Sequence, residues 1–553
     1  MAKPVQVPAF DRGDALESLA SEQFDVLVVG GGITGAGVAL DAATRGLRTA
    51  LVERDDFASG TSSKSSKLVH GGLRYLQQRE VGLVYEGLAE RQVALRNAPH
   101  LVRVLPFLIP VLTKDGVISR RLARALGGAL WMYDLTGGLR IGKRHRRVSA
   151  DQAVAHMQTL RADRVAGGYL YYDANTDDAR LTLALCRTAA AHGAVVTNYS
   201  GVTSLRKNGD GRVRGAHVQA DGNEVEVRAD VVVNAAGVWT DDVRALDEPT
   251  HPHSIRPAKG IHITVPWGKV RNDIAVVVPV AKDRRSVFVV PWGDLTYVGT
   301  TDTDYEGPLD DPECTPDDVA YLLRALNAVI GEPVAEGDVL GTWAGLRPLL
   351  RTASNDRTAD LSRRHAVRRS DSGLVTVTGG KLTTYRRMAA DTVDEVDALL
   401  GKRRRCRTKR TKLLGAEGYE TPPDTNEPSR HVHLAHRYGT EAALVEALVD
   451  DDPALGEPLV PGLPYLKAEA VHAVRREMAR TLDDVLTRRT RARLLARDDS
   501  AAAADDVAAL VGRELGWDDA ERARQVKEYR AAVAAERDAA ELPETALESS
   551  VGT

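Results

Sequence analysis

The pattern of hydrophobic and polar positions divides the chain into three kinds of segment. Short apolar runs, as at 26–29, 50–52 and 231–233, are typical of strands buried in a parallel sheet. Residues 261–303 instead alternate apolar and polar positions, which predicts a half-exposed antiparallel sheet. From 430 to 540, Ala, Leu, Arg, Glu and Asp recur at helical spacing, so we expect helices there.

These patterns predict an α/β protein with more than one domain, because 553 residues exceed the size of a single core. We expect a doubly wound, Rossmann-like nucleotide-binding domain, an inserted and mostly antiparallel substrate domain, and an α-helical C-terminal domain. The expected ranges are 22–100, 165–250 and 335–400 for the first, 101–164 and 251–334 for the second, and 401–540 for the third. Residues 1–21 and 541–553 are expected to be tails, and the basic run 402–412 a solvated linker.

Composition and charge exclude several classes of function. The net charge is −3 and no nucleic-acid-binding motif is present, so we expect no nucleic-acid partner. Three widely separated cysteines form neither a disulfide framework nor a zinc site, and they fit a reducing cytoplasmic setting. The segment 1–22 is polar and acidic, unlike a signal peptide. No apolar window is long enough to span a membrane, which leaves attachment to a membrane surface open.

A glycine turn supplies the first candidate site. Gly30, Gly32 and Gly35 form a Gly-x-Gly-x-x-Gly between an apolar strand and a helical pattern, and Glu53 ends the next strand. Such a turn lets the backbone approach a pyrophosphate at a helix N-terminus, while the acid accepts hydrogen bonds from ribose hydroxyls. The sequence therefore predicts dinucleotide binding, and Glu53 disfavours NADP.

Three acidic residues near one another are better explained by helix capping than by a metal site. Asp173, Asp177 and Asp178 precede the helix expected near Arg180, without a His or Cys at ligand spacing. We expect them to cap that helix and to complement its dipole, and we expect no metal.

Five segments together carry a family resemblance. They are the glycine turn, Thr61–Tyr75, Asn234–Trp239, Gly345-Leu-Arg-Pro348 and Gly379–Arg386. In this order they resemble the FAD-dependent glycerol-3-phosphate dehydrogenases, flavoproteins of the glycine/D-amino-acid oxidase type. The resemblance implies non-covalent FAD as cofactor and oxidation of sn-glycerol 3-phosphate to dihydroxyacetone phosphate, with electrons passed to a membrane quinone.

The resemblance also assigns roles to particular residues. Lys381, at a turn that opens a helix, would stabilise negative charge on the reduced flavin. Arg347 is the first choice for the substrate phosphate, because a guanidinium donates two parallel hydrogen bonds to it. His262 is preferred to His70 as the base, since an ordinary histidine pKa suits proton acceptance at neutral pH. The other candidates are Arg74, Tyr75 and Arg363 for the phosphate, and Ser62, Ser63, Ser65, Ser66, Lys67, His70, Gly237, Gly379, Gly380 and Thr383 for FAD.

Two alternatives stay open at this point. The first is a glycerol-3-phosphate oxidase that uses dioxygen, although the insertion that we associate with oxidases is not visible. The second is a nucleotide-fold binding or modifying protein without this activity, which would need a nucleic-acid or acyl-binding surface.

A quinone acceptor requires contact with the bilayer. Residues 119–148 combine arginines and lysines with apolar and aromatic residues, which suits an anionic membrane surface. We expect a cytoplasmic protein attached peripherally to the inner face of the cytoplasmic membrane, and a homodimer is the assembly that we keep open. A helix packed inside the substrate domain, with its arginines outside, is the alternative.

Overall fold

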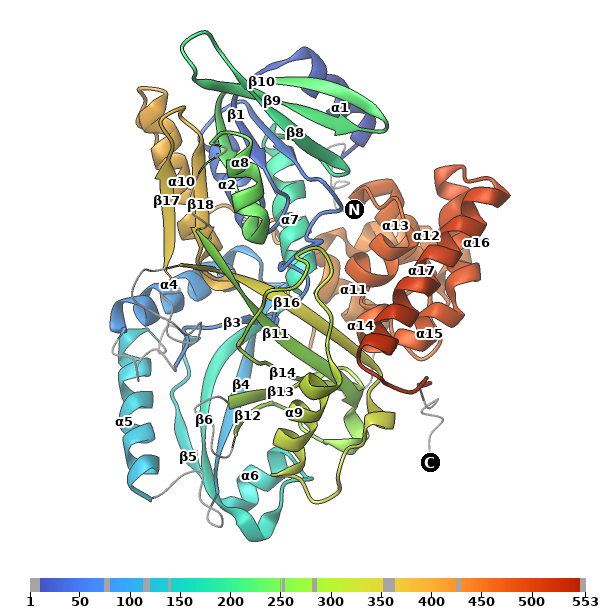
Figure 1. The fold of residues 1–553 in the computed structure, drawn as a ribbon. Coiled ribbons are helices and arrows are strands. Elements are labelled where there is room, and N and C mark those ends of the chain that lie inside the picture. Colours follow the sequence, from blue (N-terminus) through green and yellow to red (C-terminus); the bar gives the residue numbers. More distant parts are fainter. Residues whose placement is uncertain are drawn as a thin grey trace.

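The computed structural model describes residues 10–73, 80–112, 120–137, 141–248, 250, 254–280, 286–351, 364–423 and 429–547, with the backbone alone at 120–125. Two sheets and a helical region make up the molecule (Figure 1). Arg74, Tyr75 and Arg363, candidates for binding the phosphate, lie outside the described residues.

The first sheet is the predicted parallel one. Its order is β17-β18-β10-β1-β2-β7, and β1 pairs in parallel with both β10 and β2. An antiparallel extension, β8 and β9, continues from β10. The strands are β1 (Gln23–Val29), β2 (Thr49–Val52), β7 (Val195–Thr197), β8 (Ser200–Lys207), β9 (Val213–Ala220), β10 (Asn223–Asn234), β17 (His365–Arg369) and β18 (Val375–Gly379).

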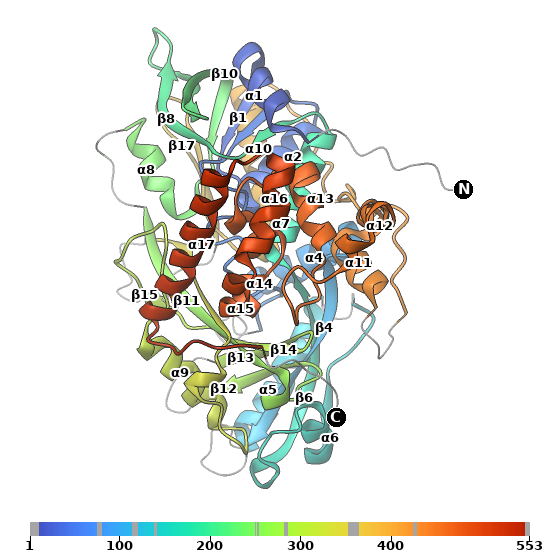
Figure 2. The ribbon, with the colours of Figure 1, turned by 90° about the vertical axis from the view of Figure 1, so that its right-hand side faces the viewer.

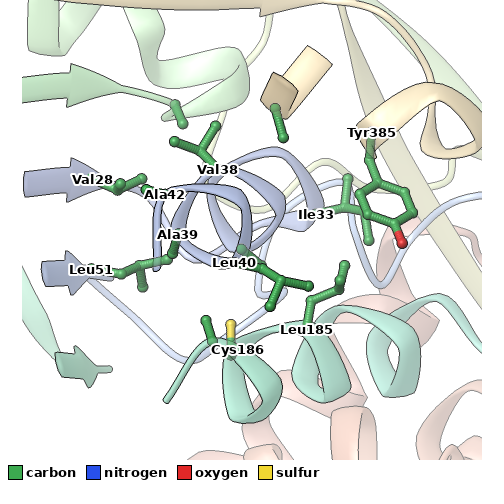
Figure 3. Close-up of a cluster of buried hydrophobic side chains, with 14 of the residues drawn as sticks. Val28, Ile33, Val38, Ala39, Leu40, Ala42, Leu51, Leu185, Cys186 and Tyr385 are labelled. Atoms are coloured by element: carbon green, nitrogen blue, oxygen red, sulfur yellow. The ribbon is translucent and has the colours of Figure 1, made fainter. Parts of the chain in front are cut away.

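Three helices cover one face of this sheet: α2 (Ile33–Thr44), α7 (Asp178–Ala191) and α10 (Tyr385–Leu399). Figure 3 shows α2 between Val28 and Leu51 of the strands, Leu185 of α7 and Tyr385 of α10. Gly35 permits this packing, because a Cβ there would lie 1.9 Å from the carbonyl oxygen of Gly30. The third glycine of the motif therefore serves helix–strand contact.

The expected N-terminal tail contains a packed helix. Helix α1 (Arg12–Ser21) buries Leu19 against the first sheet, and the Arg12 guanidinium donates to the carbonyl oxygens of Asn198 and Tyr199. The tail prediction is therefore wrong for these residues. Their apolar positions are too few to stand out in the sequence, and burial depends on a distant partner.

The second sheet is antiparallel except where β12 pairs with β4. Its strands are β3 (Leu68–Val69), β4 (Val102–Leu112), β5 (Arg146–Val148), β6 (Val165–Thr176), β11 (Ile255–Pro266), β12 (Ala275–Pro279), β13 (Ser286–Trp292), β14 (Leu295–Gly299), β15 (Thr303–Asp304) and β16 (Gly341–Leu350). Helices that accompany it are α4 (Val81–Asn97), α5 (Arg120–Thr136), α6 (Ala150–His156) and α9 (Pro316–Asn327).

The alternation in β11 does not mark a solvent-facing side, as the sequence suggested. Residues 258–265 are buried on both faces of the sheet. Ile261 and Ile263 pack with the substrate-domain core, while Thr264 on the other face donates to the carbonyl oxygen of Leu494 in the C-terminal region. Polar residues alternate here because they face a cavity and a second domain, so the half-exposed prediction is wrong.

The C-terminal region is helical, as predicted. It comprises α11 (Arg430–Tyr438), α12 (Ala442–Asp451), α13 (Lys467–Glu477), the π-helical turn η10 (Asp484–Arg489), α14 (Ala492–Leu495), α15 (Arg497–Ala502), α16 (Ala504–Leu515) and α17 (Asp519–Ala539). Figure 2 shows these helices lying across both sheet-containing parts of the molecule. The basic run 402–412 forms neither helix nor strand, and most of its side chains are exposed.

Sheet membership suggests a refinement of the domain division. Strands β6 and β16 fall within the ranges 165–250 and 335–400 that we assigned to the nucleotide-binding domain, yet both pair within the second sheet. We therefore propose that the substrate domain also includes 165–176 and 341–350.

Candidate active site

One cavity of about 430 Å³ lies where the parallel strands of the first sheet end, and it reaches β11 and β16 of the second sheet. The carboxyl ends of parallel strands are the usual place for a bound nucleotide. Of the residues named from the sequence, it is lined by Gly30, Gly32, Glu53, Ser62, Ser65, Ser66, His70, Gly237, His262, Arg347, Gly379, Gly380, Lys381 and Thr383.

The glycine turn presents the N-terminus of α2 to this cavity. Gly32 precedes the helix, and the Ser62 Oγ accepts a hydrogen bond from the backbone N–H of Ile33 at 2.8 Å. Ser62 thus brings the hydroxyl-rich segment 61–67 against the first turn of α2. Backbone donors and the helix dipole there favour a bound phosphate.

Glu53 follows β2 and lies beside the turn. Its carboxylate accepts from the backbone N–H of Gly31 at 2.6 Å and of Asp55 at 3.0 Å. Burial raises the pKa of Glu53 to about 7, against which these two hydrogen bonds act. The side chain is therefore poised to lose its proton near neutral pH.

Three of the predicted cofactor residues do not line the cavity: Gly35, which packs α2 against the strand, Ser63 and Lys67. Ser63 is buried, and its hydroxyl lies 3.4 Å from the carbonyl oxygen of Gly60. Lys67 turns away from the cavity: its ammonium donates to Asp178 and to the carbonyl oxygen of Ser63, both at 3.0 Å. A buried ammonium needs such partners, and these lie behind the loop. The expectation that Gly35, Ser63 and Lys67 line the site is corrected accordingly.

Backbone hydrogen bonds hold in place the segment that carries His70. The N–H of His70 donates to the Thr383 hydroxyl at 3.1 Å, and the N–H of Gly71 donates to the Tyr133 hydroxyl at 3.0 Å. Tyr133 in turn donates to Asp173, which is buried and paired with Arg91. Helix α5 therefore contacts the loop at the cavity through Tyr133.

The three acidic residues around Asp177 have separate roles. Asp177 caps α7 by accepting from the N–H of Arg180, as predicted. Asp173 lies in β6 and Asp178 in the first turn of α7, and both pair with buried cations. The capping prediction is therefore wrong for Asp173, because strand β6 extends to Thr176 and places it far from the helix end.

The turn Gly379–Lys381 brings a second helix N-terminus to the cavity. A short 3₁₀ helix (Leu382–Thr384) follows Lys381 and continues into α10. Lys381 occupies the position before the helix and lines the cavity. A full positive charge and a helix dipole thus act at the same end of the cavity.

His262 is held in the sheet by aromatic stacking. Its ring lies parallel to that of Trp343, with centroids 4.6 Å apart, and its Nε2 is 2.9 Å from the Ser66 hydroxyl. A Cβ on Gly299 of the neighbouring strand would lie 2.1 Å from the ring, so glycine makes room for it. Burial, with Lys67 and Arg347 nearby, holds the pKa of His262 well below its usual range. The imidazole is therefore neutral.

Arg347 lies on β16, the strand that pairs with β11, and its side chain lines the same cavity. Its guanidinium donates to the carbonyl oxygen of Thr301 and the hydroxyl of Thr300, both at 3.0 Å, and pairs with Asp302 at 3.2 Å. A Cβ at Gly260 would lie 2.5 Å from its Nη2, so Gly260 leaves space for it. These contacts fix the direction of the guanidinium before any ligand arrives.

The cavity suits a flavin dinucleotide. Its wall offers the α2 N-terminus and the Glu53 carboxylate, which fit a diphosphate and a ribose, and also Lys381 at a second helix N-terminus. Within the part of the chain that the structure describes, the buried Nε1 of Trp239 and Nδ1 of His262 have no hydrogen-bond partner. Polar atoms so placed on a cavity wall favour a polar ligand.

Sequence reasoning assigned no role to Arg54, Lys64 and Trp239, which also line the cavity. Arg54 lies over the Trp239 ring at 5.1 Å, and Lys64 pairs with Asp311 of the segment before α9. Arg54 follows Glu53 directly, and Trp239 ends the motif that begins at Asn234, so both had a local signal. Lys64 lies inside the hydroxyl-rich segment, where nothing local distinguishes it from Lys67.

Comparisons with known proteins agree with this geometry. Residues 25–386 match the model of the FAD dependent oxidoreductases, and 406–522 match the C-terminal domain of alpha-glycerophosphate oxidase. The chain is 42% identical to glycerol-3-phosphate dehydrogenase 2 of Mycobacterium tuberculosis, over 97% of this chain and 94% of the relative. It is 36% identical to the mitochondrial glycerol-3-phosphate dehydrogenase of Bos taurus, over 92% of this chain and 73% of the relative. The crystal structure of glycerol-3-phosphate dehydrogenase from Bacillus halodurans, complexed with FAD, superposes with a TM-score of 0.76 at 30% identity, covering 94% of this chain and 96% of that one.

Proposed function

Because the chain belongs to the FAD-dependent oxidoreductases, and among them to the glycerol-3-phosphate dehydrogenases, we propose that it oxidises sn-glycerol 3-phosphate to dihydroxyacetone phosphate. FAD is the cofactor of this family. The observation that carries the proposal is the convergence of His262, Arg347 and Lys381 on one cavity that the glycine turn also lines. When bound, FAD accepts the hydride from the substrate carbon.

Arg347 binds the substrate phosphate in this proposal. Its contacts with Thr300 and Thr301 are to neutral oxygens, which orient the guanidinium without neutralising its charge. Pre-orientation by Thr300 and Thr301 lowers the entropy lost on binding. Arg74, Tyr75 and Arg363 remain proposed phosphate ligands.

His262 takes the hydroxyl proton of the substrate, with His70 as the rival base. The neutral imidazole is ready to accept a proton without first losing one. Lys67 and Arg347 oppose a lasting positive charge on the ring, so the proton must pass onward to solvent soon after transfer. Lys381 and the adjacent helix N-terminus stabilise negative charge on the cofactor.

Glu53 holds the ribose, which makes FAD binding depend on pH. Ribose hydroxyls donate to the carboxylate, and the pKa of Glu53 is raised to about 7 in the protein without cofactor. Affinity for FAD should therefore rise as the pH increases through 7, by about 10-fold between pH 6 and pH 8. Titration of apoprotein with FAD, followed by flavin fluorescence, measures this. Glu53→Gln should bind FAD more weakly and with a flat pH profile. An equally steep profile in Glu53→Gln would assign the titration to another group.

The electron acceptor is a membrane quinone in this proposal, and dioxygen is the rival. Anaerobic addition of glycerol 3-phosphate should bleach the yellow protein, whereas glycerol should not. Menaquinone or ubiquinone analogues should then restore the colour much faster than dioxygen does. Failure to bleach would overturn the dehydrogenase activity, and faster recovery with dioxygen would make the protein an oxidase.

We also propose that the protein docks on the inner face of the cytoplasmic membrane. No helix in the described ranges is long and apolar enough to cross a bilayer. Helix α5 exposes Trp131, Met132 and Leu135, of which Leu135 is 72% exposed, and Tyr85 is exposed on the adjoining α4. Lys143, Arg144, Arg146 and Arg147 are exposed just after this helix. Apolar side chains beside cations fit an anionic lipid surface.

Charge reversal tests the docking surface. Glu at positions 143, 144, 146 and 147 should abolish sedimentation with anionic liposomes at low salt, because each cation near such a surface contributes about 1 kcal/mol. The matched control reverses Arg403, Arg405, Arg407 and Arg410, which are also exposed or partly exposed. Loss of binding in the control alone would move the docking surface to the run 402–412.

A further inference from the structure

Three distant parts of the chain meet on the segment Ser65–Lys67 behind the cofactor cavity. Ser65 and Ser66 line the cavity, whereas Lys67 faces the protein interior. From the substrate domain, Trp343 donates to the carbonyl oxygen of Ser65 at 3.2 Å and Tyr297 to that of Ser66 at 2.9 Å. The segment lies outside the helices and strands, and beyond the hydrogen bond from the Thr176 N–H to the Lys67 carbonyl oxygen at 2.9 Å, side-chain contacts such as these shape it.

Asp178, on the first turn of α7, makes the densest set of these contacts. One carboxylate oxygen accepts from both the N–H (3.0 Å) and the hydroxyl (2.6 Å) of Ser65. The other accepts from the Lys67 ammonium at 3.0 Å. Asp178 is fully buried and does not line the cavity. It therefore orients the segment from behind.

The C-terminal helical region reaches the same carboxylate through Arg491. This fully buried guanidinium, just after η10, pairs with Asp178 and bonds to Asp177 at 2.7 Å. It also lies 3.4 Å from the carbonyl oxygen of Ser63. Burial lowers the pKa of Lys67 to about 8, which the charge of Asp178 opposes. Two buried cations, Lys67 and Arg491, thus share the Asp178 carboxylate.

We propose that Arg491 and Asp178 are positioning residues through which the C-terminal helical region shapes the FAD-binding segment Ser65–Lys67. The inference rests on the proposed site and extends it, because neither residue touches the cavity. A buried carboxylate shared by a loop and two cations has few alternative arrangements. Loss of either partner should leave the loop misplaced, and supporting residues of this kind set how well the residues at a site bind.

The decisive comparison is Asp178→Asn against Glu441→Gln. Glu441 is buried too, and it pairs with Arg187 of the same helix α7 at 2.8 Å across the same interface, far from the loop. Both variants neutralise one buried carboxylate, so both should lower the melting temperature. Only Asp178→Asn should weaken FAD binding to the apoprotein, by about 10-fold or more, and only it should speed tryptic cleavage after Lys64.

A milder pair keeps the test decisive if Asp178→Asn fails to fold. Arg491→Lys retains the charge but loses the two-pronged contact with Asp177 and Asp178. Arg493→Lys makes the same change at a neighbouring arginine that pairs with Glu536 and Asp483. Weaker FAD binding in Arg491→Lys alone supports the proposal. If both variants of a pair bound FAD with equal affinity, Asp178 and Arg491 would only stabilise the domain interface, and the proposal would be wrong. FAD titration needs no substrate, so bleaching of the wild type by glycerol 3-phosphate tests the proposed reaction separately.

Discussion

Replacement of His262 by glutamine is expected to slow reduction of bound FAD by glycerol 3-phosphate by ~10²-fold or more, the usual contribution of a positioned base. Glutamine retains a polar group against Ser66 but cannot accept the substrate proton. FAD should stay bound, because the variant keeps a polar contact with Ser66 of the FAD-binding segment and leaves the glycine turn unchanged. Stopped-flow absorbance under anaerobic conditions measures the rate.

The pH dependence sharpens this prediction. Because burial and two cations hold the pKa of His262 well below its ordinary value of 6.5, the wild-type rate should not fall as the pH drops through 6.5. His217→Gln, at a partly exposed histidine paired with Glu224, serves as the control. Normal reduction in His262→Gln with collapse in His70→Gln would transfer the role of base to His70.

Arg347→Ala is expected to raise the Michaelis constant for glycerol 3-phosphate by roughly 10- to 150-fold, since a charge-assisted contact contributes about 1.5–3 kcal/mol. The change also removes the ion pair between Arg347 and Asp302. Steady-state kinetics with a soluble acceptor measures the constant, and FAD content should not change.

Arg256→Ala is the matched control for this variant. Arg256 lies on β11 near Arg347 and pairs with Asp304, but it does not line the cavity. A similar rise of the Michaelis constant in both variants would mean that general charge attracts the substrate. An unchanged constant in Arg347→Ala would assign that residue to the structure of the sheet.

Local chemistry explains which parts of the site were predictable. Gly30, Gly32 and Glu53 follow from covalent and backbone requirements that act within about 25 residues, namely a tight turn, a helix N-terminus and an acid after the next strand. His262 and Arg347 were found through motifs, and the structure places both on the cavity wall. That Arg347 binds the substrate phosphate and that His262 accepts the proton remain predictions, which the experiments above test.

The direction of a side chain was not predictable in the same way. Lys67 stands in a segment rich in hydroxyls, and nothing local distinguishes it from Lys64; yet Lys67 turns inward while Lys64 lines the cavity. The choice depends on Asp178 and Arg491, which are more than 100 and 400 residues away. Only folding brings these charges together.

By itself the sequence determined the α/β class, the parallel sheet with its glycine turn, the helical C-terminal region and the dinucleotide cofactor, because each depends on residue periodicity or on a short motif. Tertiary structure alone decided that α1 packs against the first sheet instead of forming a tail, that β11 is buried on both faces, and that Asp178 orients the FAD-binding segment. These features depend on the burial of polar groups. A buried polar group needs a partner, and the partner is chosen by proximity in space, which sequence spacing does not record.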